Sequence, residues 1–578
     1  MPAKPSGMVK TRTVRVRQKN GDIYVFERQT IYDSEKKYNR ILKSHLLAKI
    51  PKDTQTQVPT RPKQTKRDNS EENNENMAAY RVHVGMMDIL AHIGAESGID
   101  DALYQSTDTG TAQKIISLAR YLIATNGQSL PGILTWQLNH PLPYTEGLTE
   151  DIYHNLFVRL GHDESIQQNF FAHRAEGLDS TAAIAYDTTT VSTYSENQVE
   201  ARYGFNKDGD GLKTIKVLTL YSIDTRRPIA FTKQPGNLPD VIAIKNSLSQ
   251  LSALGLDAVE IVTDNGFYSD QNISEMLQAK FGFVTLVKTS LSWVRKEIDS
   301  HMEELSSIHT VCDFDPGIHG VTVKLTRTFA KERKYANQEA GKAKGDIEHF
   351  SRNIYLHIFY SLERHNAARA SFDADIVELK SLLEKGFPVD ELPEDTQKKV
   401  KKYLDIKTRG GKVTVTAKDE VCREAYRYQG YFALVSNREK DAFECLRKYR
   451  KRETIEDFFE EGKQYADGRR PRVWNTDTLR GRMFVQFVAL CYYEYFSDQV
   501  RQMKQSLSYS PEEVRKMNKA ELKANQKLLT WIKNTPLYIQ LQWFDTVENV
   551  NISDTLRNKR WNTETTLRDR NYLTRLGL

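Results

Sequence analysis

The sequence predicts an α/β fold in which a mixed β-sheet flanked by helices is interrupted by an inserted domain and bordered by helical N- and C-terminal regions. Three observations support this prediction. Between residues 181 and 290, short apolar runs alternate with amphipathic stretches, as packed strands and helices require. Roughly 140 further residues, up to residue 429, are not needed by such a core. At 578 residues the chain should form several structural units.

The central elements follow a recognisable order. Three strands, a helix, a strand, a second helix and another strand are expected in turn, and a later apolar run should return the chain to the same sheet. This order is the ribonuclease-H-like layout. The strands are expected at 182–187, 214–221, 228–232, 258–263, 283–288 and 430–435, and the helices at 241–254 and 269–280.

The N-terminal 50 residues concentrate the basic charge. They hold twelve Lys and Arg against four Asp and Glu, whereas the whole chain has a net charge of only +7. Two β-rich runs separated by Asn20-Gly21 predict a hairpin over 11–28 with a type I′ turn, and a helix should complete the segment. Such local charge suits a polyanion, although a merely solvated tail is the alternative. The basic side chains on the hairpin are Arg12, Arg15, Arg17, Lys19 and Arg28.

The remaining boundaries follow composition and periodicity. Residues 51–77 are polar and contain hardly any apolar side chain, so they should form a flexible linker. A helical domain is expected at 78–180, and the ribonuclease-H-like core at 181–290 plus 430–500. Residues 291–429 would form the inserted domain, and residues 501–578 a helical region with a basic tail.

Composition excludes several classes of protein. Hydrophobic residues make up 39% of the chain and charged residues 28%, and no apolar run approaches the length of a membrane span. The four cysteines lack metal-binding spacing and fit a reducing cytosol. No phosphate-binding G-x4-G-K-[ST] run and no H-E-x-x-H motif occurs. A cytoplasmic protein without a membrane partner is expected.

The most informative stretch is the predicted helix over 443–465. Helical spacing brings Tyr449, Arg452, Glu456 and Lys463 onto one stripe, beside an apolar stripe that can pack onto a core. A carboxylate flanked by two cations and a phenol is well suited to hold a metal ion and the phosphates around it. The alternative is a solvated amphipathic helix with ordinary charge pairs.

Two aspartates extend this pattern, because Asp187 and Asp264 each follow an apolar strand. A lone aspartate at that position is often only a turn or helix cap. On adjacent strands, however, two carboxylates repel each other unless a cation lies between them. With Glu456 they would form a catalytic and metal-binding set for two Mg²⁺ ions, or Mn²⁺ in their place. Glu453 and Glu460 compete for the third place.

The spacing Y-x2-R-x3-E-x6-K resembles the Y-R-E-K signature of DDE transposases of the IS-four insertion-sequence superfamily, most closely its sixteen-thirty-four branch. Further similarity lies in Tyr203-Gly204, in Gly236-Asn237-x-x-Asp240, and in the residues from Asp264 to Ser269. The ending from Asn571 onwards is similar more weakly. The resemblance spans roughly 180–500. Asn265 departs from a common arginine and Arg482 from a frequent histidine, which puts secondary contacts in doubt.

The resemblance implies cut-and-paste transposition. Water would cut one strand of double-stranded DNA at a terminal inverted repeat, and the freed 3′-hydroxyl would form a hairpin end that is reopened and joined to target DNA. Tyr449, Arg452 and Lys463 would hold phosphates. Trp293 would stack on a flipped base, unless it is an ordinary surface or core tryptophan. A homodimer on paired ends, in a prokaryotic cytoplasm and associated with the nucleoid, is also implied.

Two other functions remain open from the sequence. One is a transposase-derived DNA-binding protein that no longer cleaves, although such a chain should have lost one of the acids. The other is a ribonuclease-H-like nuclease without strand transfer, which would not need the basic hairpin or tail.

Overall fold

The structure is a computed structural model, and it describes residues 9–33, 38–52, 58–59, 80–179, 181–207, 209–332, 345–409, 412–465, 473, 475–553, 556–557 and 566–578. The chain divides into two compact units. The first comprises 1–80 with 551–557, and the second comprises 81–550 with 558–578. The expected linker, 51–77, lies almost entirely outside the described residues.

The first unit is a small antiparallel sheet in the order β1-β2-β3-β4. The predicted hairpin is present, but the predicted helix after it is wrong, because a third strand pairs with the second along its whole length. That pairing sets Val25 opposite Ala48, which are both buried. The strands are β1 (Lys10–Arg17), β2 (Ile23–Asp33), β3 (Tyr38–Ile50) and β4 (Val58–Pro59).

The hairpin turn differs from the predicted type I′. The Gln18 N–H donates to the Asp22 carbonyl, and the Gly21 N–H donates to the Gln18 carbonyl. Only Gly21 has a positive φ, at 92°, within this turn. A type I turn that ends in a left-handed glycine has this pattern, because the loop is one residue longer than a type I′ turn allows.

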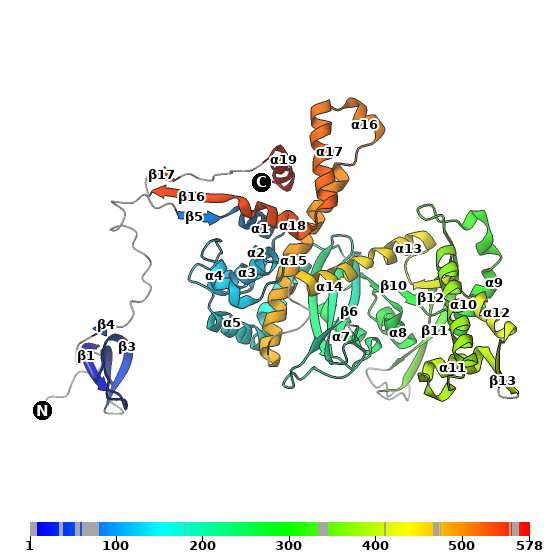
Figure 1. Cartoon of the computed structure of the whole chain (residues 1–578), viewed down its shortest axis with the longest axis horizontal. Helices are drawn as coiled ribbons and strands as arrows, with labels where there is room; N and C mark the ends of the chain where they lie inside the picture. Colours follow the sequence, from blue (N-terminus) through cyan, green and yellow to red (C-terminus); the bar gives the residue numbers. More distant parts are fainter. Residues whose placement is uncertain are drawn as a thin grey trace, which may run out of the picture. The chain divides into compact units, whose positions relative to one another are not determined.

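The second unit is built on an eight-stranded mixed sheet in the order β11-β12-β15-β10-β9-β6-β7-β8. Strand β6 is antiparallel to β7 and parallel to β9, which is parallel to β10. This is the predicted ribonuclease-H-like arrangement, and the fold class is confirmed (Figure 1). In chain order, the first strands of this sheet are β6 (Ala183–Thr193), β7 (Lys213–Ser222), β8 (Arg227–Pro235), β9 (Glu260–Thr263) and β10 (Gly282–Val287).

The predicted insertion contributes to the same sheet. Strands β11 (Ile318–Glu332) and β12 (Ile347–Ser361) form a long antiparallel pair, and β12 joins β15 (Tyr431–Ser436), which pairs with β10. The rest of the insertion is mostly helical and carries a small hydrophobic cluster of its own around Leu383 and Val415. Its other elements are α9 (Ser292–His301), α10 (Leu362–Glu384), α11 (Glu394–Tyr403), β13 (Leu404–Arg409), β14 (Lys412–Ala417) and α12 (Asp419–Arg427).

Helices cover the sheet and connect its strands. Helices α7 (Asp240–Ala253) and α8 (Asp270–Gln278) link β8 to β9 and β9 to β10. The long α15 (Thr476–Ser506) packs against α3 and α5 of the helical region before the sheet (Figure 1). That region contains α1 (Gly85–Glu96), α2 (Ile99–Ser106), α3 (Thr109–Ala124), α4 (Ile133–Trp136), α5 (Glu150–His162) and α6 (Glu164–Ala175), after β5 (Tyr80–His83).

The C-terminal region is mainly helical, as predicted. It contains α16 (Pro511–Lys516), α17 (Lys519–Asn534), α18 (Leu537–Gln542) and α19 (Leu567–Leu576), with strands β16 (Glu548–Ser553) and β17 (Leu556–Arg557) between the last two helices. Within the described part of the chain, none of the helices has the length and apolarity of a membrane span.

Candidate active site

Asp187 lies inside a strand rather than at its end. Thr188, Thr189, Thr190 and Val191 are β-branched and extend β6 to Thr193, so the predicted strand end is wrong. The ladder with β7 continues through Asp187, but the parallel ladder with β9 stops at the Ala185–Val262 pair. Asp187 therefore lies just beyond the point where β6 and β9 separate, and its side chain is buried.

Asp264 directly follows β9. In the parallel register, Ala183 pairs with Glu260 and Ala185 with Val262, so continuing that register sets Asp187 beside Asp264. The Asp264 carboxylate accepts the Asn265 N–H at 2.6 Å and the Tyr449 hydroxyl at 3.2 Å, both on Oδ1. Among the described residues no such bond is recorded on Oδ2, which leaves that oxygen for another ligand.

The predicted helix over 443–465 is interrupted once. Helix α13 (Ala442–Lys451) ends at Arg452, and α14 (Glu453–Tyr465) begins directly after it. The Arg452 N–H donates to the Tyr449 carbonyl, and the Arg452 carbonyl accepts the Ile455 N–H. These three-residue bonds tighten the chain locally. The apolar stripe beyond the break, with Ile455 and Phe458, is buried in the core as expected.

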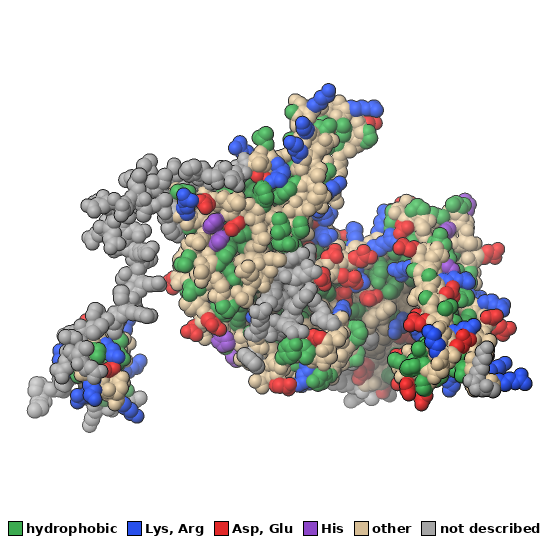
Figure 2. Space-filling view, in the orientation of Figure 1, with side chains coloured by type: hydrophobic (Ala, Val, Ile, Leu, Met, Phe, Trp, Pro, Cys, Tyr) green, Lys and Arg blue, Asp and Glu red, His purple; other side chains and the backbone are tan. Residues whose placement is uncertain are grey.

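Arg452 joins the acids of the strand and the helix. Its Nη1 lies 3.0 Å from Asp187 Oδ2, and its Nη2 lies 2.7 Å from Glu456 Oε1. Only 7% of the Arg452 side chain is exposed, whereas 56% of the Glu456 side chain is. Glu453 and Glu460 are exposed on the same helix. Figure 2 shows acidic side chains over the region of α14, with basic side chains beside them.

The electrostatics of the site follow from this burial. Burial raises the pKa of Asp187 above its ordinary value, which the cations Lys207 and Arg452 oppose and nearby Asp264 reinforces. Burial would lower the pKa of Arg452, but Asp187, Tyr449 and the other two acids raise it overall. A charged Asp187 thus depends on nearby cations, and in this structure Lys207 and Arg452 supply them.

The donor chemistry of the three acids fits a divalent metal, because carboxylate oxygens are the ligands that Mg²⁺ and Mn²⁺ prefer. In this structure, the carboxylate oxygens of the three acids do not all lie within 4.8 Å of one another. Among the described residues, the only group of three possible metal ligands that lies so close together is His83, His140 and Asp545. Arg452 lies between Asp187 and Glu456. More than half of the Glu456 side chain is exposed, so the surrounding core does not fix its orientation.

Lys207 is a residue that the sequence analysis missed. Its ammonium group donates to the Thr188 carbonyl at 2.7 Å, and its charge acts on Asp187. It lies in the irregular segment after Tyr203-Gly204, a pair already singled out by resemblance. No spacing rule connects that segment to the acids. Lys463 belongs to α14, but its side chain lies outside the described residues.

The other predicted DNA contacts lie away from these acids along the chain. Arg12, Arg15, Arg17 and Lys19 are exposed, and Arg28 is partly buried and bonds Ser44. Strand alternation sets Arg15 and Arg17 on one face of β1 and Arg12 on the other.

Trp293 is the second residue of α9 and is half-buried. The Arg327 guanidinium lies over its ring, 4.1 Å from the centroid, so one face of the ring is already covered by a cation.

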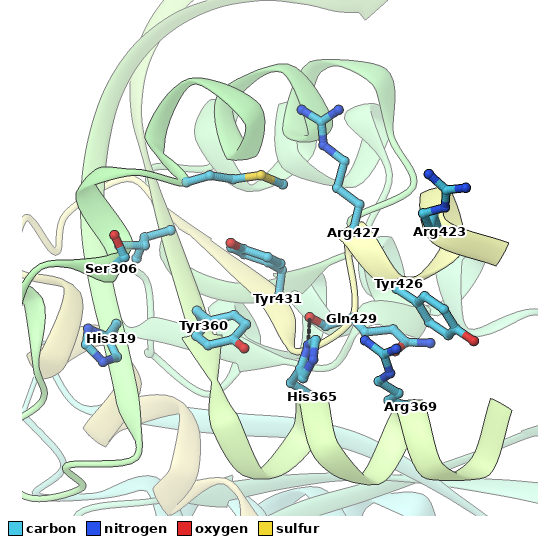
Figure 3. Close-up of a pocket in the computed structure, with 12 residues that line it drawn as sticks. Ser306, His319, Tyr360, His365, Arg369, Arg423, Tyr426, Arg427, Gln429 and Tyr431 are labelled. Atoms are coloured by element: carbon cyan, nitrogen blue, oxygen red, sulfur yellow. Dashed lines mark hydrogen bonds between the residues drawn. The ribbon is translucent and has the colours of Figure 1, made fainter. Parts of the chain in front are cut away.

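A separate cavity of about 680 Å³ lies in the inserted region. Arg423 and Arg427 of α12 and Arg369 of α10 border it, and tyrosines form much of its wall (Figure 3). Arg369 stacks on Tyr426, with the guanidinium 4.1 Å from the ring centroid. The remaining lining residues are Met302, Leu305, Ser306, His319, Tyr360, His365, Gln429 and Tyr431.

A ribonuclease-H-like sheet with acids at adjacent strands defines the class of metal-dependent enzymes that cut and join nucleic-acid strands. A family model described as "Transposase DDE domain" matches residues 179–492, more than half of the chain. The protein therefore belongs to the DDE-domain transposases, and it is a DNA transposase, a divalent-metal-dependent polynucleotidyl transferase and endonuclease.

Other comparisons add little to that result. Among solved structures, the chain is similar to a piggyBac transposase in a synaptic complex with hairpin DNA, determined by cryo-EM. The TM-score is 0.35 at 11% identity, covering 80% of this chain and 78% of the other. No match was found among curated proteins.

Proposed function

We propose that the chain is a cut-and-paste transposase of the IS-four superfamily, closest to its sixteen-thirty-four branch. One observation carries the proposal: Arg452 ties the buried Asp187 of β6 to Glu456 of α14, and Tyr449 of the same segment binds Asp264. Two members of the Y-R-E-K pattern, Tyr449 and Arg452, therefore contact the two aspartates, and Arg452 links a third member, Glu456, to them. A solvated surface helix would have no reason to bury an arginine there.

Asp187, Asp264 and Glu456 are the proposed metal ligands, for two Mg²⁺ ions that Mn²⁺ can replace. Bound there, such ions supply a polarised water and stabilise the leaving oxygen of a phosphodiester. Tyr449 keeps Asp264 oriented through its hydroxyl. Arg452 keeps Asp187 ionised, and Glu456 turns from Arg452 toward the aspartates.

The proposed reaction begins with hydrolysis. Water oxygen bonds to phosphorus at the transposon end and the 3′-oxygen leaves with a proton, giving a 3′-hydroxyl and a 5′-phosphate. The 3′-hydroxyl oxygen then bonds to a phosphorus of the opposite strand and displaces the 3′-oxygen of the flanking DNA, which leaves with a proton, and a hairpin end forms. Water hydrolyses the new phosphodiester and restores the 3′-hydroxyl. That hydroxyl finally attacks a phosphodiester of target DNA and displaces a 3′-oxygen of the target strand. Lys207, Arg452 and Lys463 have the charge to hold phosphates during these steps.

Double-stranded DNA is the proposed partner, and we propose that it also contacts residues away from the three metal-binding acids. The exposed Arg15 and Arg17 of β1 would contact the backbone of the terminal inverted repeat, with Arg12, Lys19 and Arg28 nearby. The cavity of the inserted region suits a second contact, because its arginines can bind phosphates and its tyrosines can stack on bases (Figure 3). Trp293 remains a candidate for stacking on a flipped base.

Plasmid reactions test the proposed chemistry. Supercoiled DNA carrying the cognate ends is incubated with Mg²⁺ and either the native protein, Asp264→Asn, or the control Asp257→Asn, whose exposed side chain lies before β9. The proposal is supported if the native protein and Asp257→Asn carry out strand transfer and Asp264→Asn does not. Cleavage without strand transfer would indicate a nuclease, and tight binding without nicking would indicate a non-cleaving DNA-binding protein.

Salt-dependent binding tests the basic sheet. Replacing Arg15 and Arg17 by Gln should weaken end binding and reduce the slope of log K against log salt by roughly 2, about one unit for each lost phosphate contact. Arg12→Gln, on the other face of β1, is the matched control. An unchanged slope in the double variant rules out this face as the phosphate contact.

The proposed synaptic complex is a homodimer on paired ends, because two ends must be joined in one event. Sedimentation of the protein with end DNA and Ca²⁺ should show two chains per two ends. A complex that stays at one chain per end under turnover conditions contradicts the dimer. We also propose that the protein acts in a prokaryotic cytoplasm, on the nucleoid.

A further inference from the structure

A group of two histidines and one aspartate lies in the helical region, apart from the acids of the sheet. His83 ends β5, His140 follows α4, and Asp545 lies in the short 3-10 helix between α18 and β16. One ligand atom from each lies within 4.8 Å of the others. They come from three parts of the chain with no recognisable spacing. In Figure 2, histidine and acidic side chains meet at the surface of this region.

The hydrogen bonds of the two imidazoles have one feature in common. His83 Nδ1 lies 2.6 Å from the Asp545 backbone carbonyl, and His140 Nδ1 lies 2.9 Å from the Trp136 carbonyl. A carbonyl only accepts, so both rings carry a proton on Nδ1, and a neutral ring then keeps its lone pair on Nε2. Histidines that bind metals are held in the same way, with the second nitrogen donating to a carbonyl.

The free lone pair of His140 faces an acceptor. Its Nε2 lies 2.9 Å from Asp545 Oδ1, and a neutral ring with its proton on Nδ1 would set two acceptors against each other. A metal ion bound to both atoms removes that conflict. Ligand atoms on a tetrahedral Zn²⁺ ion are about 3.3 Å apart, so a small rotation of the Asp545 carboxylate, whose side chain is 38% exposed, makes room.

The two imidazoles lie close together but need one adjustment to share an ion. The centroids of His83 and His140 are 5.1 Å apart and their planes are 20° apart, so the His83 ring must turn out of this stacked arrangement to bring its lone pair in line with an ion bound to His140. His140 is also fixed from its other face by Trp136, whose ring is parallel to it at 3.8 Å. The exposure of Asp545 leaves a fourth position open to solvent.

We propose that His83, His140 and Asp545 form a second metal site, for Zn²⁺ or a similar borderline divalent cation. Imidazole ligands favour such ions, whereas the all-carboxylate set of the sheet favours Mg²⁺. The site joins the strand that enters the second unit to the loop after α4 and to the 3-10 helix. It stabilises this junction, where the Val84 N–H also bonds the Val547 carbonyl.

Metal uptake by the full-length protein tests the site. To remove interference from the catalytic acids, all variants carry Asp264→Asn. After dialysis against a chelator, Co²⁺ is added as a spectroscopic probe and bound Zn²⁺ is counted by elemental analysis. The parent should bind one Zn²⁺ per chain, gain the visible absorption of four-coordinate Co²⁺, and show a Zn²⁺-dependent rise in Tm.

His83→Phe and Asp545→Asn should each lose the bound ion, the absorption and the rise in Tm, whereas His309→Ala, at an exposed histidine elsewhere, should keep all three. His140→Cys gives a positive signal that a merely misfolded variant would not give. A cysteine that binds the ion adds a sulfur-to-cobalt charge-transfer band. Equal metal uptake by parent, His83→Phe and Asp545→Asn overturns the proposal. So does a folded parent that binds no Zn²⁺, which would indicate that His140 is instead a protonated partner of Asp545.

Discussion

The two halves of the central sheet treat buried ionisable groups differently. In the half that holds β6 and β9, Asp187 is buried and its charge is balanced by Arg452 from another element. In the half that holds β12 and β15, His357 is fully buried but neutral, with its ring nitrogens 2.9 Å from the Thr322 hydroxyl and 3.0 Å from the Ser436 hydroxyl. Burial lowers the pKa of His357 to about 4.

This difference indicates that the buried charge of Asp187 serves function, whereas the neutral His357 serves packing. A neutral ring with two hydroxyl partners satisfies a sheet interior at little cost. A buried ion pair is expensive to desolvate and is often no more stabilising than apolar residues of the same size. The first half of the sheet retains one nevertheless, and this is the place where we propose that a cation binds. Four predictions test the comparison, from the largest expected effect to the smallest.

Replacing Glu456 by Gln should reduce DNA cleavage by roughly 10³-fold or more, an effect comparable to losing another preorganised catalytic group. The fold should be retained, because the Glu456 side chain is 56% exposed. Glu453→Gln, three residues earlier on α14, is the matched control and should cleave normally. If Glu453→Gln or Glu460→Gln were the inactive variant instead, the assignment of the third acid would be wrong.

Arg452→Ala should lower the free energy of unfolding by about 3–5 kcal/mol, because it leaves the Asp187 carboxylate buried without its partner. Arg450→Ala is the control: its pair with Asp315 is more than a third exposed, and its loss should cost at most about 1 kcal/mol. Urea unfolding measures both. Equal effects of the two variants would contradict the role given to Arg452.

The stability of the second half should depend on pH through His357. Its pKa is about 4 in the folded chain, below the ordinary 6.5, so between these values only the unfolded chain binds the proton. Stability is therefore complete above pH 6.5 and falls as pH drops toward 4, by about 1.4 kcal/mol per pH unit and about 3 kcal/mol in total. Urea unfolding of His357→Gln should show a flatter pH profile than that of His309→Gln.

Tyr449→Phe should have the smallest effect. It removes one hydroxyl donor to Asp264, which is worth about 1 kcal/mol of stability, and cleavage should fall much less than in Glu456→Gln. Parallel unfolding and cleavage measurements check this. A loss of cleavage as complete as that of Glu456→Gln would instead make the phenol a participant in the reaction.

The sequence predicts the sheet well because its strands are apolar runs that must be buried on both faces. It fails where tertiary pairing decides the outcome. An aspartate after an apolar run resembles the start of a turn, yet pairing with β7 extends the strand through Asp187 and the threonines after it. The predicted insertion contributes β11 and β12 to the main sheet, because their pairing with β15 cannot be read from local pattern.

The candidate site shows the same limit. The stripe of Tyr449, Arg452 and Glu456 follows from helical spacing, although the break at Arg452 does not. Lys207 lies in an irregular segment with no periodicity to relate it to Asp187. The group of His83, His140 and Asp545 depends on contacts between distant segments, and single-sequence patterns do not record those.

The order of the acids along the chain has a consequence for the cell. During synthesis, at about 5–20 residues per second, Asp187 and Asp264 leave the ribosome well before Glu456, because the whole insertion and β15 must be translated between them. Any nascent or prematurely terminated product that stops before α13 carries two carboxylates and lacks Arg452, which pairs with the first of them. On the proposed assignment, such fragments lack the third metal ligand, so they should be unable to nick DNA.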